Sequence, residues 1–302
     1  RKIIVSPTVH PEYRATLHTY TRGTDLTVET PNSKLQTSNF EVESLEFEVD
    51  EDTACLIIQQ PDFFGQLLST NSENGLSGLA DAVHEAGALF VVMVDPISLG
   101  LFTPPGEYGA DIVVGEGQAL GNPLNFGGPY LGIFACREEY VRRMPGRLAG
   151  ETVDTEGRRG FVLTLATREQ HIRRERATSN ICTNQALCAL AAGAYLAAMG
   201  KSGLRKVAEL CYHKAHYAAK QIAALPGFDL VGDKPFFKEF VVRCPKPPGE
   251  INEALLERGI IGGYDLGRDY PQLENHTLLC VTEMNSRAEI DRLVEALEEV
   301  TS

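Results

Sequence analysis

This sequence lacks lysine over one long stretch, and it lacks closely paired cysteines. No lysine occurs between Lys34 and Lys201. The seven cysteines are scattered, odd in number and without a C-x-x-C pair, so a disulfide framework or a zinc site is a poor interpretation. We therefore expect no metal site, and buried, reduced cysteines in a cytoplasmic protein.

Three further absences limit the function. No apolar run approaches the roughly 20 residues that a membrane helix needs, so we expect no membrane partner. The net charge of −13 argues against nucleic acid as a general partner, because phosphate binding needs a basic surface. A core-type strand follows Arg1 at once, without an initiator methionine or a signal peptide, so we expect an N-terminal portion of a longer chain to be missing.

The first 200 residues alternate between strand and helix patterns. Helical periodicity ends at Gly23 and again near Gly87. Apolar runs predict strands at 3–6, 26–29, 54–59, 88–94, 111–114 and 131–135. This alternation predicts an α/β fold with a mostly parallel sheet.

After residue 200 the pattern is helix–strand–strand–helix–strand–helix, typical of an α+β module, with Ser286 and Glu289 as a capping box for the last helix. We divide the chain into a large α/β domain, residues 1–200, and a small C-terminal α+β domain, residues 201–302. Residues 184–199 form an alanine-rich pattern that is apolar almost all the way round, which predicts a buried helix stopped at Gly200.

Residues 144–180 break the alternation and are rich in arginine. We expect irregular structure there, with a short strand at 161–165. Arg168, His171, Arg173 and Arg174 form a basic cluster in an acidic chain. Arginine forks suit carboxylates and phosphates, so the cluster is a solvated loop, a subunit interface or a site for an anionic ligand.

A glycine-rich loop follows the strand at 111–114. Gly115, Gly117 and Gly121 lack the G-x-G-x-x-G spacing of a dinucleotide site. The Asn122-Pro123 pair that follows cannot lead into the regular helix at whose N-terminus a phosphate would bind. The loop therefore does not predict nucleotide binding.

Asp95 closes the apolar strand at 88–94. In pyridoxal-phosphate (PLP) enzymes an acid at such a strand end holds the pyridine nitrogen protonated. The lysine that forms the Schiff base belongs on the loop after the strand at 111–114, where this chain has Gln118 and Ala119, and neither can form an imine. The alternative is that Asp95, which directly precedes Pro96, is only a capping or loop aspartate.

The chain resembles one family in three stretches: GEYGADIVVGEGQALGNPLNFGGP at 106–129, MPGRLAGETVD at 144–154 and TREQHIRRERATSNICTNQ at 167–185. They are similar to glycine decarboxylase, the P-protein of the glycine cleavage system. The similarity is to the subunit 1 type, which corresponds to the N-terminal half of the single-chain form.

This resemblance implies a PLP-dependent transferase fold of type I. In two-subunit P-proteins the cofactor lysine belongs to subunit 2, so PLP is expected on the partner subunit. Ala119, with Gln118 beside it, replaces that lysine, and Asp95 is a vestigial cofactor contact. This chain then carries no catalytic residue of its own.

The resemblance also implies the reaction and the partners. Subunits 1 and 2 together decarboxylate glycine and pass the aminomethyl group to the lipoyl arm of the lipoylated H-protein. Arg168, His171, Arg173 and Arg174 are then candidates for the interface or for binding the glycine carboxylate. A regulatory scaffold of the same fold is the alternative, and a self-sufficient PLP enzyme is the less favoured one.

Overall fold

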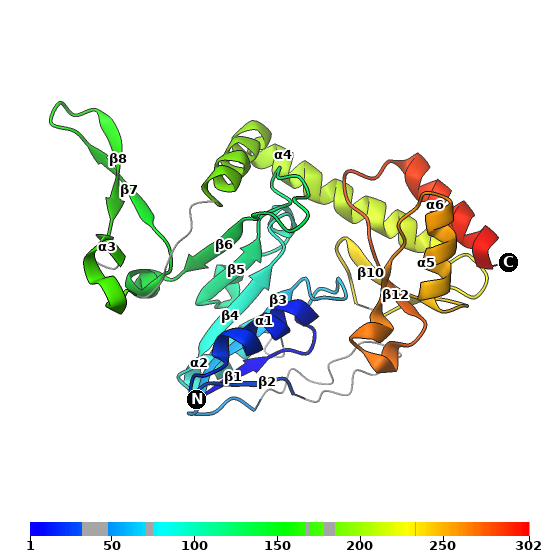
Figure 1. The fold of residues 1–302 in the computed structure, drawn as a ribbon, viewed down its shortest axis with the longest axis horizontal. Coiled ribbons are helices and arrows are strands. Elements are labelled where there is room, and N and C mark those ends of the chain that lie inside the picture. Colours follow the sequence, from blue (N-terminus) through cyan, green and yellow to red (C-terminus); the bar gives the residue numbers. More distant parts are fainter. Residues whose placement is uncertain (32–47, 71–74, 167–169, 178–184, 233, 302) are drawn as a thin grey trace.

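The computed structural model describes residues 1–31, 48–70, 75–166, 170–177, 185–232 and 234–301. A six-stranded sheet lies in the N-terminal part and a four-stranded sheet in the C-terminal part, and the long helix α4 runs from one to the other (Figure 1). A two-stranded hairpin projects from the body at one end of the molecule.

The six-stranded sheet has the order β2-β1-β3-β4-β5-β6, and all neighbours are parallel except β5 and β6. Its strands are β1 (Lys2–Val5), β2 (Thr27–Glu29), β3 (Thr53–Gln60), β4 (Leu89–Val94), β5 (Ile112–Glu116) and β6 (Gly132–Cys136). The α/β fold with a mostly parallel sheet is therefore confirmed.

Helices cover both faces of this sheet. Leu56 and Ile58 of β3 pack with α2 (Leu76–Glu85), whereas Ile57 packs on the other face with Leu17 of α1 (Pro11–Thr21). Successive side chains of a strand point to opposite faces. A strand covered on both faces must therefore be apolar throughout, which is why β3 and β4 are continuous apolar runs in the sequence.

The second sheet is antiparallel, with the order β11-β12-β10-β9. Its strands and helices are β9 (Asp229–Val231), β10 (Glu239–Arg243), β11 (Tyr264–Asp265), β12 (His276–Cys280), α5 (Pro248–Glu257) and α6 (Arg287–Thr301). The capping box is confirmed: Glu289 donates its backbone N–H to the Ser286 hydroxyl at 3.2 Å, and Ser286 donates its own to the Glu289 carboxylate at 2.6 Å.

Short 3₁₀ helices connect these elements. They are η1 (Ser98–Gly100), η2 (Pro105–Tyr108), η3 (Glu138–Arg143), η5 (Arg174–Arg176), η6 (Leu266–Arg268) and η7 (Pro271–Leu273).

The helix α4 (Gln185–Ile222) is interrupted at Gly200, whose φ of 60° and ψ of −177° are not helical. By length and composition α4 could cross a membrane, which for a single helix is weak evidence. The part before Gly200 reaches only about 22 Å at about 1.5 Å per residue, short of a hydrocarbon core of about 30 Å. Gly200 coincides with the predicted boundary, and the division into two domains stays a prediction.

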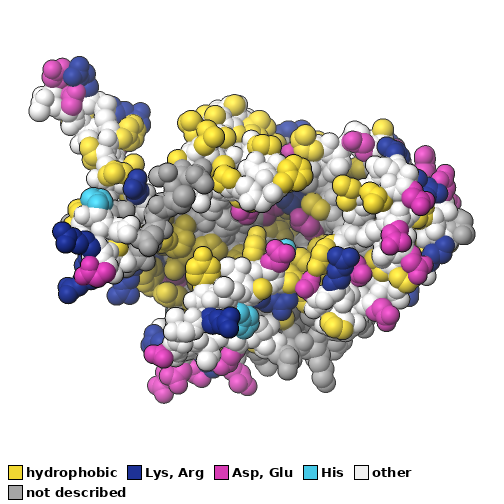
Figure 2. All heavy atoms as spheres, in the orientation of Figure 1, with side chains coloured by type: hydrophobic (Ala, Val, Ile, Leu, Met, Phe, Trp, Pro, Cys, Tyr) yellow, Lys and Arg dark blue, Asp and Glu magenta, His cyan; other side chains and the backbone are white. Residues whose placement is uncertain are grey.

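The first half of α4 is not buried, so that prediction is wrong. Leu187 and Leu190 leave 74% and 70% of their surface exposed, and of the helix before Gly200 only Cys188 and Ala192 are buried. Figure 2 shows apolar side chains gathered on the surface over this part of the helix. A helix that is apolar all round is buried only when other elements cover every side of it. The described part of this chain covers one side of the helix.

The projecting hairpin consists of β7 (Leu148–Val153) and β8 (Arg159–Thr164), followed by the short helix α3 (Gln170–Arg173) (Figure 1). The strand predicted at 161–165 is confirmed as part of β8, whereas the expectation of irregular structure is wrong over β7. Val153 and Phe161 expose 64% and 63% of their surface. The hairpin therefore presents apolar side chains to its surroundings.

A short antiparallel pairing joins the two sheets. Gly65 accepts the backbone N–H of Phe237 at 3.0 Å, and Gln66 forms a β-bridge with Phe236. Phe63 and Phe64 pack into the face of the second sheet that its helices leave free, against Val241 among others. Gly65 has a φ of +82°, and a Cβ built on it would lie 1.9 Å from the backbone oxygen of Glu239.

We predict that Gly65→Ala lowers the free energy of unfolding by about 3 kcal/mol, because it adds a backbone clash to the cost of a left-handed side-chain residue. Gly87→Ala is the matched control. Gly87 also has a positive φ, of +72°, but its Cβ would meet nothing within 4 Å, so we expect a loss of about 1 kcal/mol. Chemical denaturation of the chain measures both values, and equal losses would contradict the clash.

Candidate functional site

The carboxyl ends of β3, β4 and β5 open onto a cavity of about 390 Å³, here called the strand-end cavity. Gln59 and Asp95 line it from two of these strands, and Gln118 and Ala119 line it from the loop after β5. Lys238 enters from the segment that precedes β10. Parallel strands deliver their carboxyl ends to one edge of a sheet, which is where α/β proteins bind ligands.

Asp95 follows the last residue of β4 and is half-buried. Its Oδ1 accepts the backbone N–H of Ile97 at 2.9 Å, so it caps the turn after Pro96, as the simpler interpretation predicts. Its other oxygen, Oδ2, lies 2.5 Å from Nζ of Lys238. The carboxylate thus has a structural contact on one oxygen and a cation on the other.

Lys238 remains charged in this position. Burial by itself lowers the pKa of Lys238, but the negative charges of Asp95 and Glu239 raise it, and the net result lies above the ordinary value. Burial also raises the pKa of Glu239, which Lys238 acts to lower. The sequence gives no signal for Lys238, because only the folded chain brings it to Asp95.

The residues of the strand-end cavity do not fit a covalently held PLP. Ala119 and Gln118, which were predicted at the lysine position, line the cavity and cannot form an imine, and the Gln118 amide donates to the backbone oxygen of Asn122 at 2.6 Å. The ammonium of Lys238 occupies the side of Asp95 that the ring nitrogen of PLP would have to contact. The loop after β5, residues 117–131, contains turns and no helix, so it lacks the helix N-terminus of a dinucleotide site.

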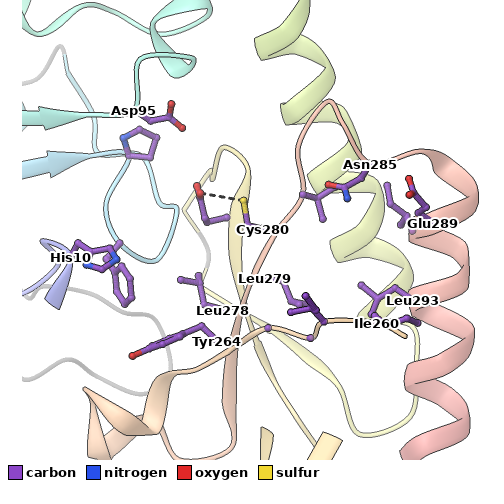
Figure 3. Close-up of a pocket in the computed structure, with 18 of the residues that line it drawn as sticks. His10, Asp95, Ile260, Tyr264, Leu278, Leu279, Cys280, Asn285, Glu289 and Leu293 are labelled. Carbon is purple, nitrogen blue, oxygen red and sulfur yellow. Dashed lines mark hydrogen bonds between the residues drawn. The ribbon is translucent and has the colours of Figure 1, made fainter. Parts of the chain in front are cut away.

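A larger cavity of about 610 Å³ adjoins the first and shares Gln59 and Asp95 with it. It lies between the loop after β3 and the second sheet, and we call it the inter-sheet cavity. Figure 3 shows His10 and Asp95 on one side, and Asn285 and Glu289 on the other. Between them the Cys280 thiol donates to the carboxylate of Glu239 at 3.4 Å.

Two titratable groups of the inter-sheet cavity are shifted by burial. Burial lowers the pKa of His10, whose Nδ1 accepts the backbone N–H of Glu12 and caps α1. Burial raises the pKa of Asp62 to about 7, although its carboxylate accepts the backbone N–H groups of Phe64 and Gln66. Both groups are therefore held by the local fold and carry less charge than in water.

The basic cluster lies apart from both cavities. His171, Arg173 and Arg174 are exposed on α3 and η5, at the base of the projecting hairpin (Figure 1). Arg168 lies outside the described residues. Of the described members of the cluster, His171, Arg173 and Arg174, none lines either cavity, so these three are not brought together with Asp95 within this chain.

The fold defines the structural class, which is that of the fold type I PLP-dependent enzymes. Two solved structures share the fold at low identity, each matching 99% of this chain with a TM-score of 0.65. One is a sphingosine-1-phosphate lyase of Burkholderia pseudomallei, at 18% identity over 62% of its chain. The other is C-DES with glycine linked to its PLP cofactor, at 15% identity over 74% of its chain.

The family follows from closer matches. The glycine cleavage system P-protein family matches residues 1–297, and the chain belongs to that family. A crystal structure of glycine decarboxylase (P-protein) in inhibitor-bound form matches 99% of this chain and 65% of its own, with a TM-score of 0.87 and 44% identity. The resemblance found in the sequence is thereby confirmed.

Two curated relatives bear the name "Probable glycine dehydrogenase (decarboxylating) subunit 1". The protein of Thermomicrobium roseum is 58% identical over all of this chain, and that of Moorella thermoacetica is 53% identical over 98% of it. The chain spans 66% and 65% of the length of these two relatives.

We predict that Asp62→Asn gains stability relative to the unchanged chain as the pH rises. The folded-state pKa of about 7 exceeds the ordinary value of 3.8, so between about pH 4 and about pH 7 the folded chain holds the proton that the unfolded chain releases. Asp62 therefore costs stability across this window, up to about 4 kcal/mol, and asparagine does not. Urea denaturation at a series of pH values measures the difference.

Asp50→Asn is the control, because the hydrogen bond from Lys2 lowers the pKa of Asp50. A carboxylate with a lowered pKa adds stability as the pH rises, so this variant should lose ground where Asp62→Asn gains it. A difference for Asp62→Asn that stays level or falls with rising pH would contradict the burial argument.

Proposed function

We propose that this chain is the subunit of a two-subunit glycine decarboxylase that does not carry the cofactor. A partner of the subunit 2 type supplies the lysine-bound PLP, whose ring accepts the electrons released when glycine loses CO2. The aminomethyl group then passes to the lipoyl arm of the H-protein. The observation that carries the proposal is the strand-end cavity, which Ala119 and not a lysine lines from the loop after β5, and in which Lys238 lies against Asp95.

What this chain contributes is surface. The apolar face of α4 around Leu187 and Leu190, and the hairpin side chains Val153 and Phe161, are exposed. An exposed apolar area of this kind indicates a protein contact. We assign these surfaces and the arginines of α3 and η5 to the contact with the partner subunit or to the approach of the glycine carboxylate.

The first test is reconstitution. This chain and a subunit 2 protein, mixed with lipoylated H-protein, should release CO2 from glycine, and neither subunit alone should do so. Activity of this chain alone would overturn the assignment and favour a self-sufficient enzyme. Full activity of subunit 2 alone would favour the regulatory scaffold.

We predict that the double change Arg173→Ala with Arg174→Ala reduces assembly with subunit 2, or glycine decarboxylation, at least about tenfold, because charged pairs at a contact each contribute on the order of 1.5 kcal/mol or more. Assembly is measured by light scattering and turnover by CO2 release. Arg205→Ala with Lys206→Ala is matched in charge, but these exposed residues lie on α4 after Gly200, outside the assigned surfaces, and already pair with Glu209.

The control variant should retain assembly and turnover. If the Arg173 and Arg174 variant also retains both, the assignment of the cluster is wrong and the solvated-loop interpretation holds.

A further inference from the structure

The side chain of Lys238 crosses from the second sheet into the strand-end cavity of the first. Lys238 is the residue before β10, and the backbone pairing of Gly65 with Phe237 fixes the position of this segment. The Lys238 and Asp95 side chains are only 14% and 18% exposed. An ion pair so far out of water is held by its position and is not a chance surface contact.

We propose that Lys238 is a built-in counter-ion that occupies the place of the cofactor ring nitrogen and excludes PLP from this chain. The inference deepens the proposed function and rests on it. In PLP enzymes an acidic partner of the pyridine nitrogen faces a positive charge on the ring. Here the ammonium of Lys238 supplies that charge to Asp95 at 2.5 Å.

The charges in the cavity explain why the exclusion is strong. A cofactor ring that took Asp95 for itself would displace the ammonium of Lys238 towards Glu239 or leave it without a partner. An uncompensated buried charge is costly, so the cavity disfavours the incoming ring. Lys238 also cannot serve as a covalent anchor, because its pKa is raised and a protonated amine does not attack an aldehyde.

The loss of the loop lysine and the gain of Lys238 are therefore separate obstacles. Ala119→Lys restores the amine but leaves Lys238 on Asp95. Lys238→Met frees Asp95 and keeps the length of the side chain, but provides no amine. Only both changes together give an imine-forming amine and a free acid in one cavity.

The test compares PLP labelling of the full chain in variants carrying Ala119→Lys alone, with Lys238→Met, or with Lys220→Met. Lys220 is an exposed lysine of α4, so it controls for loss of charge alone. Each protein is incubated with PLP and reduced with borohydride, and the adducts are located by peptide mass. We expect the Lys238→Met combination to carry at least about ten times more label on the introduced lysine than the other two.

Equal labelling of the three variants, whether high or absent, would overturn the exclusion. A stoichiometric adduct on Lys238 of the unchanged chain would overturn it as well. Neither result requires subunit 2 or turnover, so the outcome is independent of the reconstitution test.

A second measurement addresses the ion pair itself. Unfolding of Lys238→Met, of Asp95→Asn and of the double variant forms a thermodynamic cycle. We expect the double variant to be more stable than the sum of the two single losses implies, by about tenfold in the unfolding equilibrium constant. Additive losses would mean that Lys238 and Asp95 do not act as a pair.

Discussion

The structure depends on one constraint, which is that a parallel sheet brings the ends of its central strands to a single edge. That edge holds Asp95, and a carboxylate placed there needs a partner of opposite charge. The second sheet supplies it, because the pairing at Gly65 and the packing of Phe63 and Phe64 hold Lys238 above the edge. The buried pair is weak evidence for stability by itself. Its effect is to give the half-buried carboxylate of Asp95 a partner of opposite charge.

Much of the remaining surface is explained by what the chain does not cover. A two-stranded hairpin is marginal in water without a further layer to pack on. The apolar side of α4 before Gly200 is in the same situation. Both features fit a subunit whose outer layer comes from another chain or from the third of the relatives' length that this sequence does not span.

The sequence predicted those parts of the fold whose environment is local or uniform. The strands β3 and β4 were found within a residue or so, because both faces of a central strand are apolar in any such fold. The capping box was found because two residues three positions apart, Ser286 and Glu289, suffice to specify it. The absence of lysine between Lys34 and Lys201 led to the prediction that Ala119 stands where a cofactor lysine would be, and this stays a prediction.

Other features could not be predicted because their cause lies elsewhere in space. The segment of β7 has no alternating apolar pattern, and only its pairing with β8 makes it a strand. The exposure of Leu187 depends on which neighbours are present. The contact of Lys238 with Asp95 joins distant parts of the chain, so neither residue marks the other in the sequence.

The ion pair also limits which substitutions could create a PLP site in this cavity. Under the proposed function, no single substitution turns the strand-end cavity into a PLP site. An amine introduced at Ala119 would lie in a cavity where Lys238 already neutralises Asp95. Removal of Lys238 alone would leave the Asp95 carboxylate buried without a cation. Each single change leaves one of the two obstacles in place, so the proposed division of labour between two subunits is not reversed by one mutation.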